Sequence, residues 1–432
     1  MPESLGSDRP AAAPSPGAGP IRPGGKAQIR RKKPAISKEA QPPLFALKAK
    51  KMVTPLRIVE DAVLVIDGEK IRFAGAAVNV PVPEGIEVLD LGDKILCPGF
   101  IDIHHHGAAG ARASGGVDAV KKIGQFLPST GCTAWLPTVN AKEHCVEIVK
   151  VMKSGGTGGA DIPGIHMEGP FLAPKALEGR PEVDAHLLKP DVRALNSIQE
   201  AAEGHVLLMG FGIEMPGSFD VIREAGRIGI LPAVAHTKGD YELFMRAVDA
   251  GIRHATHIYN VMTRMHHRKP GIVGGILTCD EITGELIGDG LHVHPAALDI
   301  AIRCKGTDKV ALITDQSELA GMPDGRYQRP NGVFVIKKDG ICRMEGFDES
   351  VDNTMAGSSL TIDFDLRTLV NKVGLKLHEA VKMASLTPAR IVRIDKTKGS
   401  LEPLKDADIA VLNPDLTVEA TYVKGQRRFS RQ

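Results

Sequence analysis

Two histidines in the segment from Pro98 to Gly107 (PGFIDIHHHG) are spaced to bind one metal ion. An apolar run leads into them, and alternate side chains of an extended strand share one face. His104 and His106 would therefore point together while His105 points away. Imidazole nitrogens are common ligands of zinc, iron and similar divalent ions. A histidine-rich strand end also makes ordinary polar contacts, so this segment alone leaves both interpretations open.

Further ionisable residues follow other short apolar runs, namely Glu168, His236, His257 and Asp315. With the two histidines they would form a set able to hold one or two divalent ions and leave positions for water. Such an ion activates water near neutral pH, and Asp315 beside it would take the proton and pass it to a leaving group. Taken singly, His257 could be a hydrogen-bonded strand residue and Asp315 a helix N-cap.

The elements that would position these residues are short apolar runs alternating with segments of helical length. The runs cover residues 99–104, 133–138, 162–168, 206–214, 230–236, 254–260, 285–293 and 310–315. Eight such units predict an α/β fold, a (β/α)8 TIM-like barrel. The candidate ligands lie at or near the carboxyl ends of their runs, which is the rim where barrel active sites are assembled.

Both ends of the chain predict a second, smaller domain. Short alternating runs separated by turn residues occupy residues 44–97 and 396–432, so together they are expected to build a β-sandwich domain, with the barrel at 98–395. Residues 1–43 hold eight Lys/Arg, three Asp/Glu and nine prolines without apolar periodicity. They are expected to be a disordered basic tail, either a solvated segment or an address signal.

The overall composition excludes several classes of partner. The 54 Lys+Arg nearly balance the 52 Asp+Glu, which disfavours nucleic acid or an anionic membrane as the main partner. There is no apolar segment after Met1 and no apolar run of membrane-spanning length, so secretion and membrane spanning are disfavoured. Six scattered cysteines without a Cys-X-X-Cys pair predict buried thiols in the cytoplasm.

The ordered motifs resemble the amidohydrolase superfamily and, within it, the N-acetylglucosamine-6-phosphate deacetylase family. The matching segments are Pro98–Gly107, Gly164–Phe171 (GIHMEGPF), Ala235–His236, Ala255–Met262 (ATHIYNVM), His267–Gly271 (HRKPG), Asp289–Val293 (DGLHV), Leu312–Asp315 (LITD) and Ala356–Thr361 (AGSSLT). The resemblance implies a hydrolase that converts N-acetylglucosamine 6-phosphate to glucosamine 6-phosphate and acetate. It also implies one or two divalent ions per subunit, with zinc or iron as the expected metal.

The resemblance further implies a role for each candidate ligand. Glu168, His236 and His257 would hold the principal ion. His104 and His106 would join Glu168 and Asp315 around a second ion, and Asp315 would act as general base and then as general acid. The fourth run has no lysine that could bridge two ions, so Glu168 is the expected bridge.

The same resemblance implies a substrate site for a sugar phosphate. Asn260, the backbone of Val261 and His292 would contact the phosphate. Arg268 would reach the phosphate from a neighbouring subunit, which implies a homodimer, and an arginine fork suits a phosphate. Without the resemblance, a solvated basic residue is an equally good interpretation of Arg268.

Two departures from the family concern the substrate. The stretch 173–186 carries a histidine only at His186, displaced from the usual sugar-contacting position, so His186 would substitute for it or the contact would be rebuilt. Gln316 follows Asp315 where the family commonly has alanine, and a longer residue there could reshape the acyl pocket. Another N-acyl amino sugar, such as N-acetylgalactosamine 6-phosphate, or a non-phosphorylated amide therefore stays open. A non-catalytic barrel scaffold is less favoured because the ligands and Asp315 are all present.

Overall fold

The computed structural model describes residues 44–174, 186–329, 332–346 and 355–431. The basic tail expected at 1–43 and most of the 173–186 stretch lie outside the described residues. The described residues belong to one compact unit that spans residues 42–432. The domain boundaries expected near residues 97 and 395 stay a prediction.

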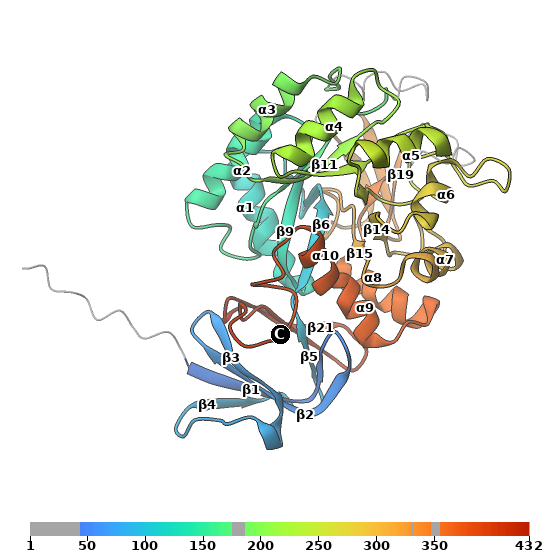
Figure 1. The fold of residues 1–432 in the computed structure, drawn as a ribbon. Coiled ribbons are helices and arrows are strands. Elements are labelled where there is room, and N and C mark those ends of the chain that lie inside the picture. The colour runs from blue at the N-terminus through green and yellow to red at the C-terminus, as the bar shows by residue number, and fades with distance from the viewer. Residues whose placement is uncertain (1–43, 175–185, 330–331, 347–354, 432) are drawn as a thin grey trace, which may run out of the picture. The chain divides into compact units, whose positions relative to one another are not determined.

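A sheet of parallel strands forms the barrel. Its order is β15-β14-β13-β12-β11-β10-β9-β6, so each strand lies beside the one that precedes it in this series. The strands are β6 (Phe100–His105), β9 (Cys132–Val139), β10 (Ile165–Glu168), β11 (Val206–Phe211), β12 (Leu231–Val234), β13 (His254–Ala255), β14 (Thr283–Ile287) and β15 (Val310–Ile313). Figure 1 shows the helices arranged around the outside of these strands. This is the winding of a (β/α)8 barrel, and the predicted fold class is confirmed.

The barrel closes between its first and last strands. The backbone N–H of Asp315 donates to the carbonyl of His104 (3.1 Å), and the N–H of His106 donates to the carbonyl of Gln316 (2.9 Å). Both bonds form just beyond the end of β15. Closure therefore brings Asp315 beside the two histidines that end β6, although they are far apart in the sequence.

Every predicted apolar run overlaps one of the barrel strands, but the last five runs, which end at residues 214, 236, 260, 293 and 315, extend beyond the carboxyl ends of their strands. The run at 254–260 is the clearest case, because only His254–Ala255 is a strand. The reason is local: His236, His257 and Asp315 have φ angles of 43°, 31° and 49°, in the left-handed region. An extended strand cannot include such a residue, so the strands end before the candidate ligands.

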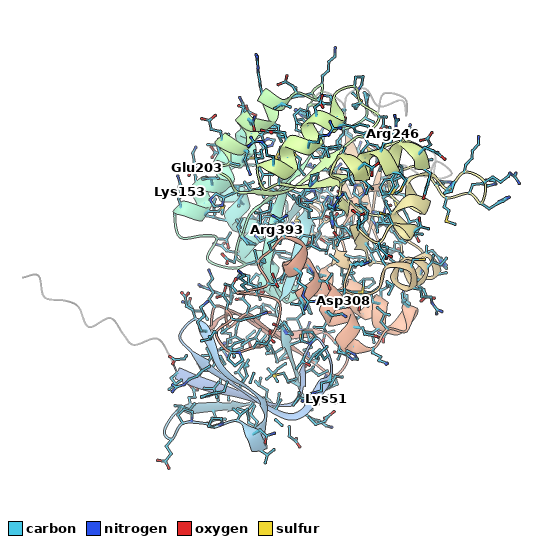
Figure 2. The ribbon with its side chains drawn as sticks, in the orientation of Figure 1. Lys51, Lys153, Glu203, Arg246, Asp308 and Arg393 are labelled. Atoms are coloured by element: carbon cyan, nitrogen blue, oxygen red, sulfur yellow. The ribbon has the colours of Figure 1, made fainter. Side chains whose placement is uncertain are left out.

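Ten α-helices are described. They are α1 (Val117–Phe126), α2 (Lys142–Lys153), α3 (Val192–Ala201), α4 (Ser218–Arg227), α5 (Tyr241–Ala250), α6 (Gly271–Thr278), α7 (Pro295–Lys305), α8 (Ile362–Thr368), α9 (Leu377–Ala384) and α10 (Leu386–Ile391). Neighbouring helices pack closely: a Cβ added to Gly275 of α6 would lie 2.4 Å from the Phe244 ring of α5. An exposed ion pair joins Lys153, at the end of α2, to Glu203, after α3 (2.5 Å; Figure 2). Within the described part of the chain, no helix combines the length and the apolar character needed to cross a membrane.

A second sheet is built from both ends of the chain, as predicted (Figure 1). Its strands are β1 (Leu44–Val53), β2 (Ile58–Asp67), β3 (Lys70–Ala76), β4 (Glu87–Asp90), β5 (Ile95–Pro98), β20 (Ile409–Leu412), β21 (Val418–Val423) and β22 (Gln426–Ser430). The sheet branches at β1, which pairs with β4 through its first half and with β5 through its second half. β5 also pairs with β20, and this ladder joins the amino-terminal strands to the carboxyl-terminal strands.

A buried lysine links this sheet to the barrel. The Lys398 ammonium lies 3.1 Å from Asp161, which precedes β10, and 2.8 and 2.7 Å from Asp406 and Asp408, which precede β20. Its side chain is 4% exposed. Carboxylates from both parts of the fold compensate the buried positive charge, which is costly when left unpaired.

A third sheet was missed by the sequence analysis. It contains the antiparallel strands β16 (Gly325–Gln328), β17 (Phe334–Lys338), β18 (Ile341–Met344) and β19 (Met355–Ser358), and it lies in the chain between β15 and α8. The turn between β17 and β18 is Asp339-Gly340, with φ angles of 51° and 82°. Positive φ at both positions is typical of a two-residue hairpin, so this Asp-Gly pair was a usable signal.

Candidate metal centre and active site

The rim of the barrel gathers the predicted metal ligands. Glu168 ends β10, while His236, His257 and Asp315 each lie two residues beyond the end of β12, β13 and β15. His104 lies in β6, and His106 directly follows that strand. We call these two histidines and the four residues above the rim cluster. All six side chains approach one another at the carboxyl ends of the strands, where the sequence predicted them.

One half of the rim cluster is centred on Glu168. Its Oε1 atom lies 2.8 Å from His236 Nε2 and 3.0 Å from His257 Nε2. The two imidazole nitrogens are 3.0 Å apart. A carboxylate oxygen and two ring nitrogens thus point at one small volume.

The other half contains the two histidines of β6 and the segment that follows it. Their Nε2 atoms are 3.2 Å apart. His106 Nε2 lies 3.3 Å from Glu168 Oε2 and 3.3 Å from Asp315 Oδ1, and His104 Nε2 lies 3.6 Å from the same Asp315 oxygen. Glu168 therefore stands between the two halves: Oε2 lies near His106, and Oε1, which faces His236 and His257, is also 3.7 Å from His104 Nε2.

Backbone strain accompanies three of the six residues. His236, His257 and Asp315 all adopt the left-handed conformation that non-glycine residues rarely adopt. Such a conformation costs about 1–3 kcal/mol per residue and persists only where the surrounding structure enforces it. Thirteen described non-glycine residues have positive φ, and three of them belong to the rim cluster. This pattern is expected of a functional site.

The electrostatics of the rim cluster favour ionised carboxylates. Burial raises the pKa of Glu168, but His236 and His106 outweigh it and hold this pKa well below its usual range. Burial likewise opposes ionisation of Asp315, and His104 and His106 keep its pKa low. For His104, burial lowers the pKa while Glu285 and Asp315 raise it to about 10. A cation entering this cluster would meet anionic oxygens and would displace protons from imidazole nitrogens.

The donor set fits a divalent metal. Ligand atoms of His104, His106 and Glu168 lie within 4.8 Å of one another, as do those of Glu168, His236 and His257. Nitrogen and carboxylate donors in groups of this size suit zinc, iron and related ions. The arrangement can therefore bind a metal and place Asp315 beside it.

The sequence analysis missed a buried carboxylate behind the rim cluster. Glu285 of β14 is fully buried, and its Oε2 lies 2.8 Å from His104 Nδ1. Its Oε1 lies 3.2 Å from Nε2 of His254, which is also buried. A charged residue inside an otherwise apolar strand was the signal, because glutamate is almost never fully buried without a partner.

Three of the predicted substrate contacts, Asn260, Val261 and His292, have hydrogen-bond partners in the structure. The Asn260 side-chain amide donates to the carbonyl of His257 (3.3 Å). The ring of His292 pairs through Nδ1 with Asp289 (2.6 Å), while its buried Nε2 has no hydrogen-bond partner among the described residues. Burial lowers the pKa of His292, and the bond to Asp289 raises it above its usual value. The Val261 carbonyl accepts from the N–H of Thr237 (3.1 Å).

The structure does not bring Arg268 or His186 into the rim cluster of the same chain. Arg268 is exposed in the segment before α6, and its guanidinium contacts His267 (2.8 Å). That segment extends away from the barrel (Figure 1). His186 is exposed as well.

The Gln316 side chain is held by other groups. Its Oε1 lies 2.7 Å from His105 Nε2, and its amide nitrogen donates to the carbonyl of Leu360 (2.9 Å). His105 faces away from its two histidine neighbours along β6. The expectation that Gln316 reshapes an acyl pocket beside Asp315 therefore gains no support from these contacts.

This protein has a parallel barrel with histidines and carboxylates at the carboxyl ends of its strands. That arrangement is typical of barrel enzymes whose active site binds divalent ions. Residues 95–428 match the Amidohydrolase family, and the chain belongs to this family.

Curated relatives and solved structures agree with this assignment. The chain is 32% identical over 369 residues to the N-acetylgalactosamine-6-phosphate deacetylase of Escherichia coli O157:H7, covering 84% of this chain and 95% of the relative. It is 30% identical over 393 residues to the N-acetylglucosamine-6-phosphate deacetylase of Bacillus subtilis (strain 168), covering 86% and 97%. A mutant N-acetyl-D-glucosamine-6-phosphate deacetylase of Mycobacterium smegmatis, solved in complex with N-acetyl-D-glucosamine-6-phosphate, superposes with a TM-score of 0.80 at 27% identity, covering 90% of this chain and all of that chain.

Proposed function

We propose that this protein is a metal-dependent deacetylase that hydrolyses N-acetylglucosamine 6-phosphate to glucosamine 6-phosphate and acetate. The observation that carries the proposal is the rim cluster, in which Glu168 meets His236 and His257 at 2.8 and 3.0 Å. Relatives that carry the name of this enzyme match nearly their whole length to this chain. The six unpaired cysteines support a reducing compartment, so we place the enzyme in the cytoplasm.

Two ions per subunit are proposed, with zinc or iron as the metal. Glu168, His236 and His257 would hold the principal ion. His104, His106 and Asp315 would hold the second ion, with Glu168 shared between them. Support comes from the two oxygens of Glu168, of which Oε1 lies near His236 and Oε2 near His106. When bound, the ions would lower the pKa of water and polarise the amide carbonyl.

The chain's own residues would carry the proton. Asp315 has a low pKa, so it is ionised at neutral pH and begins the reaction as a base. It would accept a proton from the attacking water and deliver it to the amine as the C–N bond breaks. The buried ring of His292 presents Nε2 without a partner among the described residues, which leaves this atom to bind substrate.

The phosphate would be bound by His292, Asn260 and the backbone of Val261, with His186 near the sugar. We further propose a homodimer in which Arg268 of one subunit reaches the phosphate in the other. Support comes from the exposed position of Arg268 in a segment that extends from the barrel (Figure 1). A guanidinium at such a place suits a phosphate that enters from another subunit.

N-acetylgalactosamine 6-phosphate is a second candidate substrate. The Escherichia coli relative named for this activity is 32% identical to the chain, which is as high as the relatives named for the glucosamine isomer from bacteria. The two sugars differ at one hydroxyl configuration, and the chemistry of the rim cluster would be the same for both.

Acetate release from a panel of amino sugars tests the proposal. The panel contains the acetylated glucosamine and galactosamine phosphates, their forms without phosphate, and each of these after treatment with a chelator. We expect fast, chelator-sensitive release from a 6-phosphate. Equal rates with and without the phosphate would refute the phosphate site, and full activity after complete metal removal would refute the metal-dependent mechanism.

A mixed-subunit experiment tests Arg268. Inactive Arg268→Ala and Asp315→Asn chains are co-expressed, so that a mixed dimer has one site with an intact Asp315 and an arginine from the partner. Action across the interface should restore about a quarter of the wild-type activity in a random mixture, because half of the dimers are mixed and each has one intact site. If Arg268 acts within its own chain, the mixture stays inactive.

A further inference from the structure

Glu285 makes contacts that reach both halves of the rim cluster although it is not among the proposed ligands. It lies in β14, which pairs directly with β13 and β15, and it is fully buried. Its Oε2 atom receives two contacts, from His104 Nδ1 (2.8 Å) and from the backbone N–H of His257 (3.1 Å). Its Oε1 atom lies 3.2 Å from His254 Nε2.

The contact with His104 determines which ring nitrogen carries the proton. An ionised carboxylate accepts hydrogen bonds and cannot donate them, so Nδ1 of His104 must hold the hydrogen. The other nitrogen, Nε2, then has a lone pair in its neutral form, and it is this atom that lies 3.2 Å from His106 Nε2. A histidine ligand that donates its second ring N–H to a carboxylate is thereby held in orientation and made more basic.

The contact with His257 acts on the backbone. His257 has a φ of 31°, and its N–H would lose a hydrogen-bond partner if the carboxylate were removed. An unsatisfied buried N–H costs about 1–3 kcal/mol. Glu285 therefore holds a strained backbone position at one proposed ion and a ring orientation at the other.

The charge of Glu285 also needs an explanation. A buried carboxylate without compensating charge or hydrogen bonds is strongly unfavourable. Its oxygens lie within hydrogen-bond distance of His104, His254 and the backbone N–H of His257, but none of these contacts is with a lysine or arginine. Two divalent ions at the rim cluster would provide that charge across the ring of His104.

Glu285 is not itself well placed as a ligand. One oxygen of Glu285 and one ring nitrogen each of His104 and His166 do lie within 4.8 Å of one another. An ion there would have to share His104 with the rim cluster, so that one ring would bind two ions. His166 Nδ1 is meanwhile 3.0 Å from the carbonyl of Ile103. Hydrogen bonds account for the contacts of the Glu285 carboxylate without a further ion.

We propose that Glu285 is a positioning residue that fixes the tautomer of His104 and the backbone of His257, and thereby sets the metal affinity of the centre. The inference rests on the proposed metal-dependent function. Glu285 would not touch substrate, and it would act only through the two histidines.

The test is Zn²⁺ binding by metal-stripped protein, measured by competition with a chromophoric chelator. Glu285→Gln keeps the size of the side chain but offers one acceptor oxygen instead of two. We expect its Zn²⁺ affinity to fall by about 10–100-fold, the usual effect of removing such a partner. Glu285→Asp keeps the charge but is shorter, so its affinity should lie between those of the wild type and Glu285→Gln.

Asp408→Asn is the matched control. Asp408 is a buried carboxylate, 2.7 Å from Lys398, and it also accepts from the backbone N–H of Lys424 (2.8 Å); within the described part of the chain its side chain bonds no member of the rim cluster. Its substitution should lower thermal stability and leave Zn²⁺ affinity unchanged, which separates a general loss of stability from a specific effect on the centre.

The outcomes distinguish the two proposals. If folded Glu285→Gln binds Zn²⁺ as tightly as the wild type, the positioning role is wrong. If Glu285→Gln does not fold, the Zn²⁺ affinity of Glu285→Asp is the test instead. A Zn²⁺ affinity equal to that of the wild type in Glu285→Asp would then show that the positioning role is wrong. If the wild-type protein binds no Zn²⁺, it is the proposed metal-dependent function that fails.

Discussion

Replacement of Asp315 by asparagine separates metal binding from proton transfer. Asp315 Oδ1 lies 3.3 Å from His106 Nε2 and 3.6 Å from His104 Nε2. The group formed by Glu168, His236 and His257 is held by its own contacts of 2.8 and 3.0 Å. Asparagine has nearly the same shape as aspartate. The Glu168, His236 and His257 group should therefore keep its geometry and the principal ion.

The expected loss of turnover follows from the lost proton transfer. An amide at position 315 can neither take a proton from water nor return it to the amine. Removing a general acid–base group typically slows a reaction by about 10²–10⁴-fold. This corresponds to about 3–5 kcal/mol in the activation barrier, because each tenfold change in rate is about 1.4 kcal/mol.

Two measurements are needed on the same Asp315→Asn preparation, namely acetate release under saturating substrate and metal content by elemental analysis. We expect the principal ion to remain and turnover to fall by the stated factor. Asp308→Asn, a surface substitution beside Lys382, is the control and should change neither quantity. Turnover within tenfold of wild type would refute the role of Asp315, and complete loss of metal would refute the independence of the Glu168 group.

Three further predictions concern the metal and the stability of the fold. Chelation should abolish activity and lower the melting temperature, because an ion that binds only the native state stabilises it, and added Zn²⁺ should restore both in an activity assay paired with a thermal melt. Glu318→Gln should destabilise the protein by about 2 kcal/mol, since Glu318 bonds Arg112 and Arg329 at 2.8 Å each. Burial raises the pKa of Glu318, but the two arginines hold it below its usual value, so its stabilisation is present above the unfolded pKa of about 4.3 and is lost as pH falls through the folded pKa. The difference between wild type and variant in melting temperature should therefore shrink below about pH 4, and a constant difference would contradict this account. Gly275→Ala should destabilise by about 1–3 kcal/mol because its Cβ would lie 2.4 Å from the Phe244 ring, and Phe244→Leu should relieve part of that cost in urea unfolding of the double variant.

The sequence by itself determined the barrel and the members of its rim cluster. Strand residues alternate with a period of two, and in a parallel barrel all strand ends reach the same rim, so local patterns were enough to select Glu168, His236 and Asp315. Both ends of the chain also showed the short alternating runs of the shared sheet. These are properties of neighbouring residues, and they can be recognised without knowing what packs against them.

Only the tertiary structure decided how those residues work together. The left-handed backbone at His257, the position of Glu168 between two histidine pairs and the contacts of Glu285 all depend on strands that are distant in the chain. No local pattern records that Glu285 accepts from His104 and from His257, since closure of the barrel is what makes them neighbours. The sheet of β16–β19 was missed partly for the same reason, because its short strands become stable only when they pair with one another.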